Sequence, residues 1–179
     1  EFTILTATRA SELLNARWEE IDISGRMWSI PSERMKMKRE HRVPLSGRCL
    51  EILKAAKELN SEDIVFPSSK PGAPLSHTAT LMALRLMGRG DLTVHGFRAT
   101  FKTGAEEKTK FDTLVIEASM AHQVKKIERH YLRTTFFEQR KRAGCWARRA
   151  NTLGAKKVRL TARRLLPWPV TTHAHRQYP

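Results

Sequence analysis

The spacing of apolar residues changes early in the chain, and this change limits what the chain can fold into. Residues 9–17 are rich in Ala, Leu, Glu and Arg, which favour a short helix. Ile21 and Ile23 then alternate with polar neighbours, and after a Ser-Gly turn signal at 24–25 the alternation resumes over 27–30. The sequence therefore predicts a helix followed directly by a β-hairpin.

A third strand and a series of helices are expected after this hairpin. The basic stretch 34–42 leads to Val-Pro-Leu at 43–45, which predicts a further hairpin and a third strand. Downstream, apolar residues recur at helical spacing behind Ser, Thr or His residues that suit helix starts. The expected helices cover 46–59, 76–87, 95–108, 111–120, 125–132 and 135–149. We therefore predict an α+β, mainly helical fold with a small three-stranded antiparallel sheet packed on a helical bundle.

The length of 179 residues allows one domain with a tail. Periodicity fades towards the C-terminus while Arg, Pro, Trp and Thr accumulate, so we expect a domain over 1–149 and a basic tail over 150–179 that is disordered or aberrant. The chain begins without Met inside an apolar segment, which suggests that it is a piece of a longer protein. It shows no transmembrane run, signal peptide or cysteine framework, so we expect a cytoplasmic protein without a membrane partner.

The net charge of +15 indicates a polyanionic partner, but most of the excess lies near the C-terminus. Residues 132–179 contain 12 of the 33 Lys and Arg residues and a single acid, Glu138. The first 131 residues contain 21 basic and 17 acidic residues. Charge alone is therefore weak evidence that the folded part binds DNA.

Six residues are candidates for chemistry on a phosphodiester. They are Arg9, Lys36, His95, Arg98, His122 and Tyr131. Taken singly, each has an ordinary explanation as a solvated or packing side chain. Two arginines suit an anionic phosphate, because a guanidinium donates two parallel N–H bonds that lysine cannot imitate. On a helix His95 and Arg98 would share one face and could reach a single phosphate.

The order and context of these residues resemble the tyrosine recombinase family. Arg9, followed three residues later by Glu12, resembles the first arginine motif of that family. Lys36 lies eight residues before Pro44 and resembles the hairpin lysine that precedes a Val-Pro-Leu strand. The resemblance covers about residues 3–149, and segments 33–45, 93–100 and 131–142 look especially like integrases of prophages and genomic islands. It implies a catalytic domain whose N-terminal DNA-binding domains are missing from this chain.

The remaining candidate residues also resemble motifs of the tyrosine recombinase family. His95-Gly-Phe-Arg98 resembles the His-x-Leu-Arg box of the family. Ala121-His122, with Tyr131 nine residues later, resembles the spacing of the second histidine and the nucleophile. The resemblance implies that Tyr131 attacks a DNA phosphate, which gives a 3′-phosphotyrosyl bond and a free 5′-hydroxyl.

The resemblance also implies a role for the other residues. Lys36 would protonate the 5′ leaving oxygen, His95 would help to move the tyrosine proton, and His122 would hydrogen-bond the phosphate. Glu12 would orient its neighbours rather than react. Three further basic residues would contact phosphate non-specifically, namely Lys38, Arg39 and Arg42. One phosphoester is exchanged for another, so no metal or other cofactor is expected.

The implied function is site-specific recombination, the integration or excision of a phage or other mobile element. The expected partner is double-stranded DNA, and the expected assembly is a homotetramer on two DNA sites. Two alternatives remain open: an inactive DNA-binding remnant of an integrase, and a type IB topoisomerase-like strand transferase. Outside the candidate set we expect Trp28 in the core and His41 and His77 on the surface.

Overall fold

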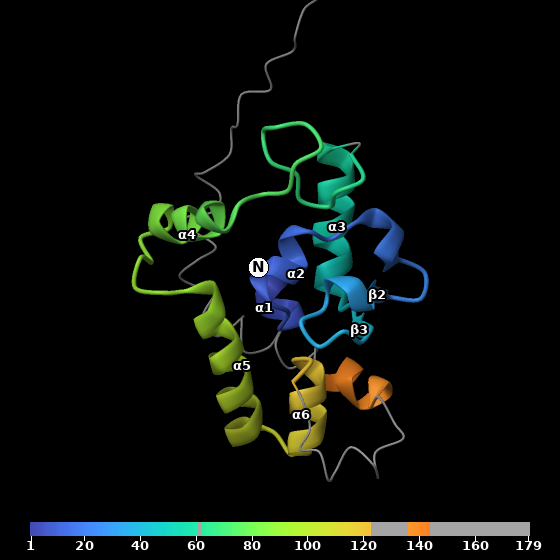
Figure 1. The fold of residues 1–179 in the computed structure, drawn as a ribbon. Helices are drawn as coiled ribbons and strands as arrows, with labels where there is room; N and C mark the ends of the chain where they lie inside the picture. The colour runs from blue at the N-terminus through green and yellow to red at the C-terminus, as the bar shows by residue number, and fades with distance from the viewer. Residues whose placement is uncertain (61, 123–135, 144–179) are drawn as a thin grey trace, which may run out of the picture.

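The computed structural model describes residues 1–60, 62–122 and 136–143 (Figure 1). Its helices are α1 (Phe2–Thr6), α2 (Ala10–Leu14), α3 (Gly47–Leu59), α4 (His77–Leu86), α5 (Val94–Lys108) and α6 (Thr113–Ser119), and residues 137–143 are also helical. Its strands are β1 (Ile21–Asp22), β2 (Met27–Ile30) and β3 (His41–Pro44), with 3-10 turns η1 (Trp18–Glu20) and η2 (Ser32–Arg34). The mainly helical α+β prediction is confirmed. Tyr131, the expected helix at 125–132 and the tail lie outside the described residues.

The three strands form one antiparallel sheet in the order β1-β2-β3. Trp28 pairs with Ile21 on one side and with Val43 on the other, and Ile30 pairs with His41. Trp28 and Ile30 are fully buried while Met27 and Ser29 are half-buried, which is the alternation that the sequence predicted. The hairpin and the core position of Trp28 are therefore confirmed.

The helix α1 lies between two clusters of buried side chains. The larger cluster joins the sheet to α2 and α3, and α1 contributes the Phe2 ring, which lies 5.9 Å from the ring of Trp28. The smaller cluster lies between α5 and α6, and Ala7 at the end of α1 belongs to it. Figure 1 shows α1 and α2 in the middle of the molecule, with α3 to their right and α5 and α6 lower in the view. The sequence predicted no helix at this position.

The predicted helix at 9–17 is shorter in the structure, because the chain after α2 pairs with a distant segment. Trp18 N donates to Asp63 O at 2.9 Å, and Val65 N donates to Ala16 O at 2.9 Å. Arg17 and Ile64 form a β-bridge between these bonds. The backbone of residues 16–18 therefore bonds to residues 63–65 rather than continuing the helix.

Helices α3 and α4 begin at the predicted serine caps, and α5 begins behind a threonine cap that the sequence did not predict. The hydroxyl of Ser46 accepts from Cys49 N at the start of α3, and the hydroxyl of Ser76 accepts from Ala79 N at the start of α4. Thr93 caps α5 in the same way through Gly96 N. Helix α5 therefore starts one residue before the predicted position.

Residues 137–143 dock on β3 through a buried arginine and a buried histidine. The Nη2 atom of Arg140 donates to Arg42 O at 2.6 Å and lies 3.5 Å from His41 Nε2. His41 is buried because it shares the inner face of β3 with Val43. The expectation of a surface position was therefore wrong for His41, whereas His77 is exposed as expected.

The burial of His41 predicts a loss of stability in acid. Burial, reinforced by the positive charges of Arg140, Arg9 and Arg98, lowers the pKa of His41 from 6.5 to about 3. Between these two values the unfolded chain binds more protons than the folded chain, so the free energy of unfolding falls as the pH falls. From pH 7 to pH 5 this group should contribute a loss of about 2 kcal/mol.

Urea denaturation at pH 7 and pH 5 measures this loss. His41→Gln should flatten the pH dependence by the same amount, because glutamine does not titrate. His77→Gln, which removes an exposed histidine, should leave the pH dependence of the wild type unchanged. An equal pH dependence in the wild type and in His41→Gln would contradict the interpretation.

Candidate functional site

A buried guanidinium joins three segments that are far apart in the sequence. Arg98, in the second turn of α5, is 3% exposed. Its Nη1 donates to Ala7 O, and its Nη2 donates to Met120 O at 2.7 Å. The same Nη2 lies 3.2 Å from His122 Nε2. One side chain therefore fixes the end of α1, the end of α6 and His122 relative to α5.

Both carbonyls that hold Arg98 lie at helix ends where an alanine is in the left-handed conformation. Ala7 ends α1 with φ 52°, and Ala121, also with φ 52°, follows Met120 at the end of α6. After α6, Ala121 N donates to Ala118 O and His122 N donates to Glu117 O, which is the double hydrogen bond of a Schellman cap. The left-handed position costs an alanine about 1–2 kcal/mol relative to glycine. The contacts with Arg98 stabilise this conformation at both ends.

Arg9 is held by a network of hydrogen bonds and ion pairs that begins in the sheet. Its Nη1 donates to Glu12 Oε1 at 2.6 Å, and its backbone N donates to Glu12 Oε2 at 2.8 Å. The backbone carbonyl of the buried Glu12 accepts from Arg34 Nη2 at 2.5 Å. Arg34 also pairs with Glu20, which accepts from Trp28 Nε1 at 2.9 Å. Glu12 therefore orients Arg9 and is itself tied to β2.

The two arginines lie close enough to influence each other. Burial and the charge of Arg9 lower the pKa of Arg98, while Glu12 and Glu117 act in the opposite direction. Arginine stays protonated in proteins, so both guanidinium groups keep their charge. In the part of the chain that the structure describes, Glu12 is the carboxylate that binds Arg9, and Arg98 bonds to carbonyls and to a histidine. The pair is therefore an incompletely neutralised site for an anion.

His122 contacts Arg98 with one ring nitrogen and a carboxylate with the other. Its Nδ1 lies 2.6 Å from Oε2 of Glu117, whose Oε1 pairs with Lys102 of α5. The sequence analysis missed both Glu117 and Lys102. A signal for Lys102 existed, because it follows Arg98 by four residues and so shares its helix face. Glu117 contacts His122 only because the chain reverses at Ala121.

The remaining predicted residues lie on exposed parts of the fold. Lys36 lies in the loop between η2 and β3, and His95 lies in the first turn of α5. No hydrogen bond or ion pair between described residues joins either side chain to Arg9, Arg98 or His122. The predicted DNA contacts are also exposed, namely Lys38, Arg39 and Arg42. Tyr131 lies outside the described residues, nine positions after His122.

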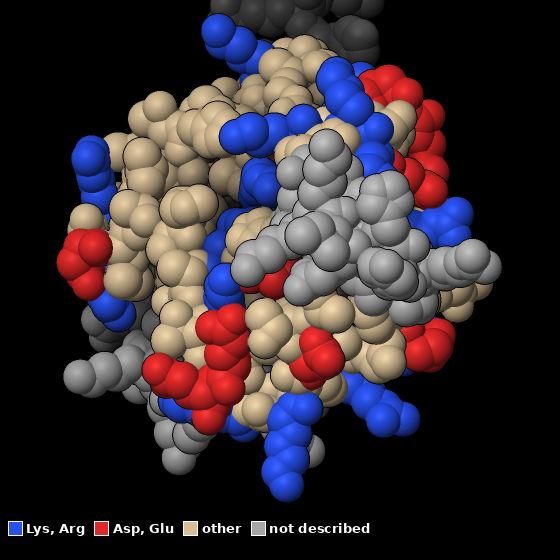
Figure 2. Space-filling model, turned by 60° about the horizontal axis from the view of Figure 1, so that its bottom comes forward, with Lys and Arg blue, Asp and Glu red and all other residues tan. Residues whose placement is uncertain are grey.

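One face of the molecule carries a run of basic side chains. On the face drawn in Figure 2, Lys and Arg side chains run through the middle of the view, while most Asp and Glu side chains lie lower or near its edges. Among the described residues no three His, Cys, Asp or Glu side chains come together as metal ligands would. None of the described helices is long and apolar enough to cross a membrane.

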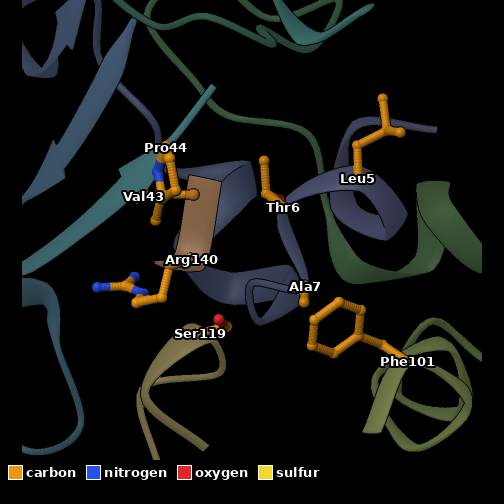
Figure 3. Close-up of a pocket in the computed structure, with 8 residues that line it drawn as sticks. All are labelled: Leu5, Thr6, Ala7, Val43, Pro44, Phe101, Ser119 and Arg140. Atoms are coloured by element: carbon orange, nitrogen blue, oxygen red, sulfur yellow. The ribbon is translucent and has the colours of Figure 1, made fainter. Parts of the chain in front are cut away.

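A small cavity lies behind the site, between α1, β3, α5, α6 and residues 137–143 (Figure 3). Its lining includes Ala7, Phe101, Ser119 and Arg140, and its volume is about 20 Å³. That volume holds about one water molecule, so the cavity is too small for a nucleotide. A polymeric substrate therefore has to approach the arginines from the surface.

Comparisons with known proteins agree with this architecture. The model of the phage integrase family matches residues 1–138. Prophage integrase IntA of Escherichia coli K12 is 41% identical over 147 residues, which cover 80% of this chain and 35% of the relative. The integrase of Enterobacteria phage P4 is 30% identical over 153 residues, which cover 76% of this chain and 34% of the relative. The chain thus spans about a third of the length of these relatives.

Two solved structures share the fold. The crystal structure of XerA recombinase superposes with a TM-score of 0.56 at 18% identity, over 76% of this chain and 52% of that chain. The Tn1549 transposon integrase in complex with circular intermediate DNA gives a TM-score of 0.55 at 14% identity, over 74% of this chain and 52% of that chain. With the family match over most of the described residues, the conclusion is that the chain belongs to the phage integrase family.

Proposed function

We propose that the chain is the catalytic domain of a tyrosine site-specific recombinase, which integrates or excises a mobile element through a 3′-phosphotyrosyl intermediate on Tyr131. Membership of the phage integrase family implies site-specific recombination. The observation that carries the finer proposal is the convergence of Arg9, Arg98 and His122 at the junction of α1, α5 and α6. The domain proposed for this activity covers residues 1–149, with residues 150–179 as a tail.

The charge balance of the arginine pair supports a phosphate as its ligand. Two guanidinium groups that lie close together repel each other, and Glu12 offsets only part of this charge. A phosphodiester supplies the missing negative charge. The transition state of phosphoryl transfer gathers more charge on the non-bridging oxygens, so fixed N–H donors stabilise the transition state more than the ground state. The described contacts engage three of the five N–H groups of Arg98, which leaves two donors for the phosphate.

The reaction exchanges one phosphoester for another. The hydroxyl oxygen of Tyr131 attacks phosphorus and forms a P–O bond, while the bond from phosphorus to the 5′ oxygen breaks. His95 accepts the tyrosine proton and Lys36 gives a proton to the 5′ oxygen, which leaves a free 5′-hydroxyl. Rejoining is the reverse reaction on a second DNA end. The atoms balance without a metal ion or a nucleotide.

The exposed basic residues around the start of β3 suit contacts with the DNA backbone. Lys38 and Arg39 lie with Lys36 in the loop between η2 and β3, and Arg42 lies in β3 with its side chain exposed. Such contacts position a protein on DNA without reading its sequence. We propose double-stranded DNA as the partner and a homotetramer on two DNA sites as the assembly, for the whole protein of which this chain is the catalytic part.

The proposed nucleophile, Tyr131, can be tested by trapping its covalent bond to DNA. With a nicked suicide substrate that carries the cognate site, the chain should form a covalent protein–DNA adduct visible on a denaturing gel. Tyr131→Phe should abolish this adduct, because phenylalanine has no oxygen to form the bond. The only other tyrosine provides the control: Tyr178→Phe should form the adduct at the rate of the wild type. An adduct that persists in Tyr131→Phe would disprove the assignment.

The planar guanidinium of Arg98 can be tested by exchanging it for an ammonium of the same charge. Arg98→Lys keeps the charge but loses the two-armed contact with Ala7 O and Met120 O and the parallel donors for phosphate. The rate of adduct formation should fall by about 100-fold or more. Arg89, an exposed arginine that pairs with Asp91 through two nitrogens, is the matched control, and Arg89→Lys should keep the rate. Thermal melting of both variants separates lost activity from lost folding. A rate within twofold of the wild type in Arg98→Lys would contradict the proposal.

A further inference from the structure

The ring of His122 is held at two points by a single residue of α6. Its backbone N donates to Glu117 O at 3.0 Å, and its Nδ1 lies 2.6 Å from Glu117 Oε2. The other ring nitrogen, Nε2, faces Arg98 Nη2 at 3.2 Å. The imidazole therefore lies between a carboxylate and a guanidinium.

The chemistry of these two neighbours determines where the ring carries its proton. A carboxylate can only accept a hydrogen bond, and a guanidinium can only donate one. Nδ1 must therefore carry a proton and donate it to Glu117, while Nε2 must offer its lone pair to Arg98. In water a neutral imidazole can carry its proton on either nitrogen, so the choice is imposed by the surroundings.

Glu117 is kept in its charged form by a second partner. Burial alone would raise the pKa of Glu117, but hydrogen bonds from Lys102 and His122, together with the charge of Lys102, lower it below its usual range. Lys102 reaches Glu117 from α5 and also lies 3.9 Å from Glu106. The carboxylate that faces Nδ1 is therefore ionised at neutral pH.

We propose that Glu117 is a positioning residue for the recombination reaction: it fixes the proton of His122 on Nδ1 and thereby lets Nε2 take up a proton when the DNA phosphate arrives. This inference rests on the proposed function. The phosphate oxygen replaces Nε2 as the acceptor of the Arg98 N–H group. Nε2 then receives a proton from the solvent, and the imidazolium donates a hydrogen bond from this N–H group to the phosphate while Glu117 balances the new charge on the ring.

The charges around the ring make Glu117 decisive for this step. The groups that face His122, or face Arg98 beside it, come from α2, β3, α5 and α6. They are Arg9, Glu12, His41, Arg98, Lys102 and Glu117. Glu12 is engaged by Arg9, so Glu117 is the carboxylate that contacts the ring within the described part of the chain. Without it the ring would lie among cations, which oppose a second proton.

The position of the ring proton can be measured without DNA. The full 179-residue chain is labelled with ¹⁵N-histidine, and long-range ¹H–¹⁵N spectra near pH 7.5 report which nitrogen is protonated. His122→Gln identifies the signals of His122. We expect a protonated Nδ1 in the wild type and a mixture of both neutral forms in Glu117→Gln, since an amide can either donate or accept. Glu106→Gln, which removes the other carboxylate near Lys102, should match the wild type.

Adduct formation on the suicide substrate provides the second readout. Glu117→Gln should lower the rate about tenfold or more, with the largest loss above neutral pH, where uptake of the second proton is hardest. Glu106→Gln should keep both the rate and its pH profile. A purely structural role of Glu117 would lower the rate equally at every pH.

The two readouts separate this inference from the proposed function. A wild-type His122 that is protonated on Nε2, or a Glu117→Gln spectrum identical to that of the wild type, would overturn the inference even if the chain cleaves DNA. A Glu117→Gln variant with an unchanged pH profile would overturn it as well. A wild-type chain that forms no Tyr131 adduct but keeps the Nδ1 proton would instead count against the proposed function. If Glu117→Gln does not fold, the wild-type spectrum alone tests whether the proton of His122 lies on Nδ1.

Discussion

The buried guanidinium of Arg98 is the group on which the arrangement of the site depends. Removing a cation from water is costly unless its hydrogen bonds are replaced. Here the replacements are two backbone carbonyls, Ala7 O and Met120 O, which lie 91 and 22 residues away in sequence. The ends of α1 and α6 must therefore meet on the same side of α5. The left-handed Ala7 and Ala121 are consistent with this demand, because each turns the chain so that a carbonyl faces the guanidinium.

A second polar network connects the site to the sheet and meets the first at a short segment of chain. It runs from Trp28 through Glu20, Arg34 and Glu12 to Arg9. Arg9 lies only two residues after Ala7, which Arg98 binds. The network from the sheet therefore holds Arg9, and Arg98 of α5 holds Ala7. Both residues belong to the short connection between α1 and α2. This explains how two arginines from separate parts of the fold come close enough to influence each other.

The sequence predicted local structure well and long-range burial poorly. Alternation at 27–30 and the caps Ser46 and Ser76 depend on neighbours in the chain, and their structural outcomes agree with the prediction. The helix α1 has only five residues and would not form alone. Its existence depends on packing against the sheet and α5, which no local pattern shows. His41 was misjudged for the same reason, since its environment consists of Arg140, Ser119 and the two site arginines, all distant in sequence.

Two carboxylates, Glu12 and Glu117, lie at the site that we propose binds an anionic phosphate. Glu12 and Glu117 each bind one candidate side chain with one oxygen and a further N–H group with the other oxygen. Each acid thereby fixes a donor in one orientation and removes the entropy that this donor would lose on binding phosphate. Each acid contacts its own side chain directly, Arg9 or His122, so these contacts offset part of its charge before a phosphate arrives. Preorganised donors that face an approaching anion are what a phosphoryl-transfer site requires, because their orientation then costs nothing at the moment of reaction.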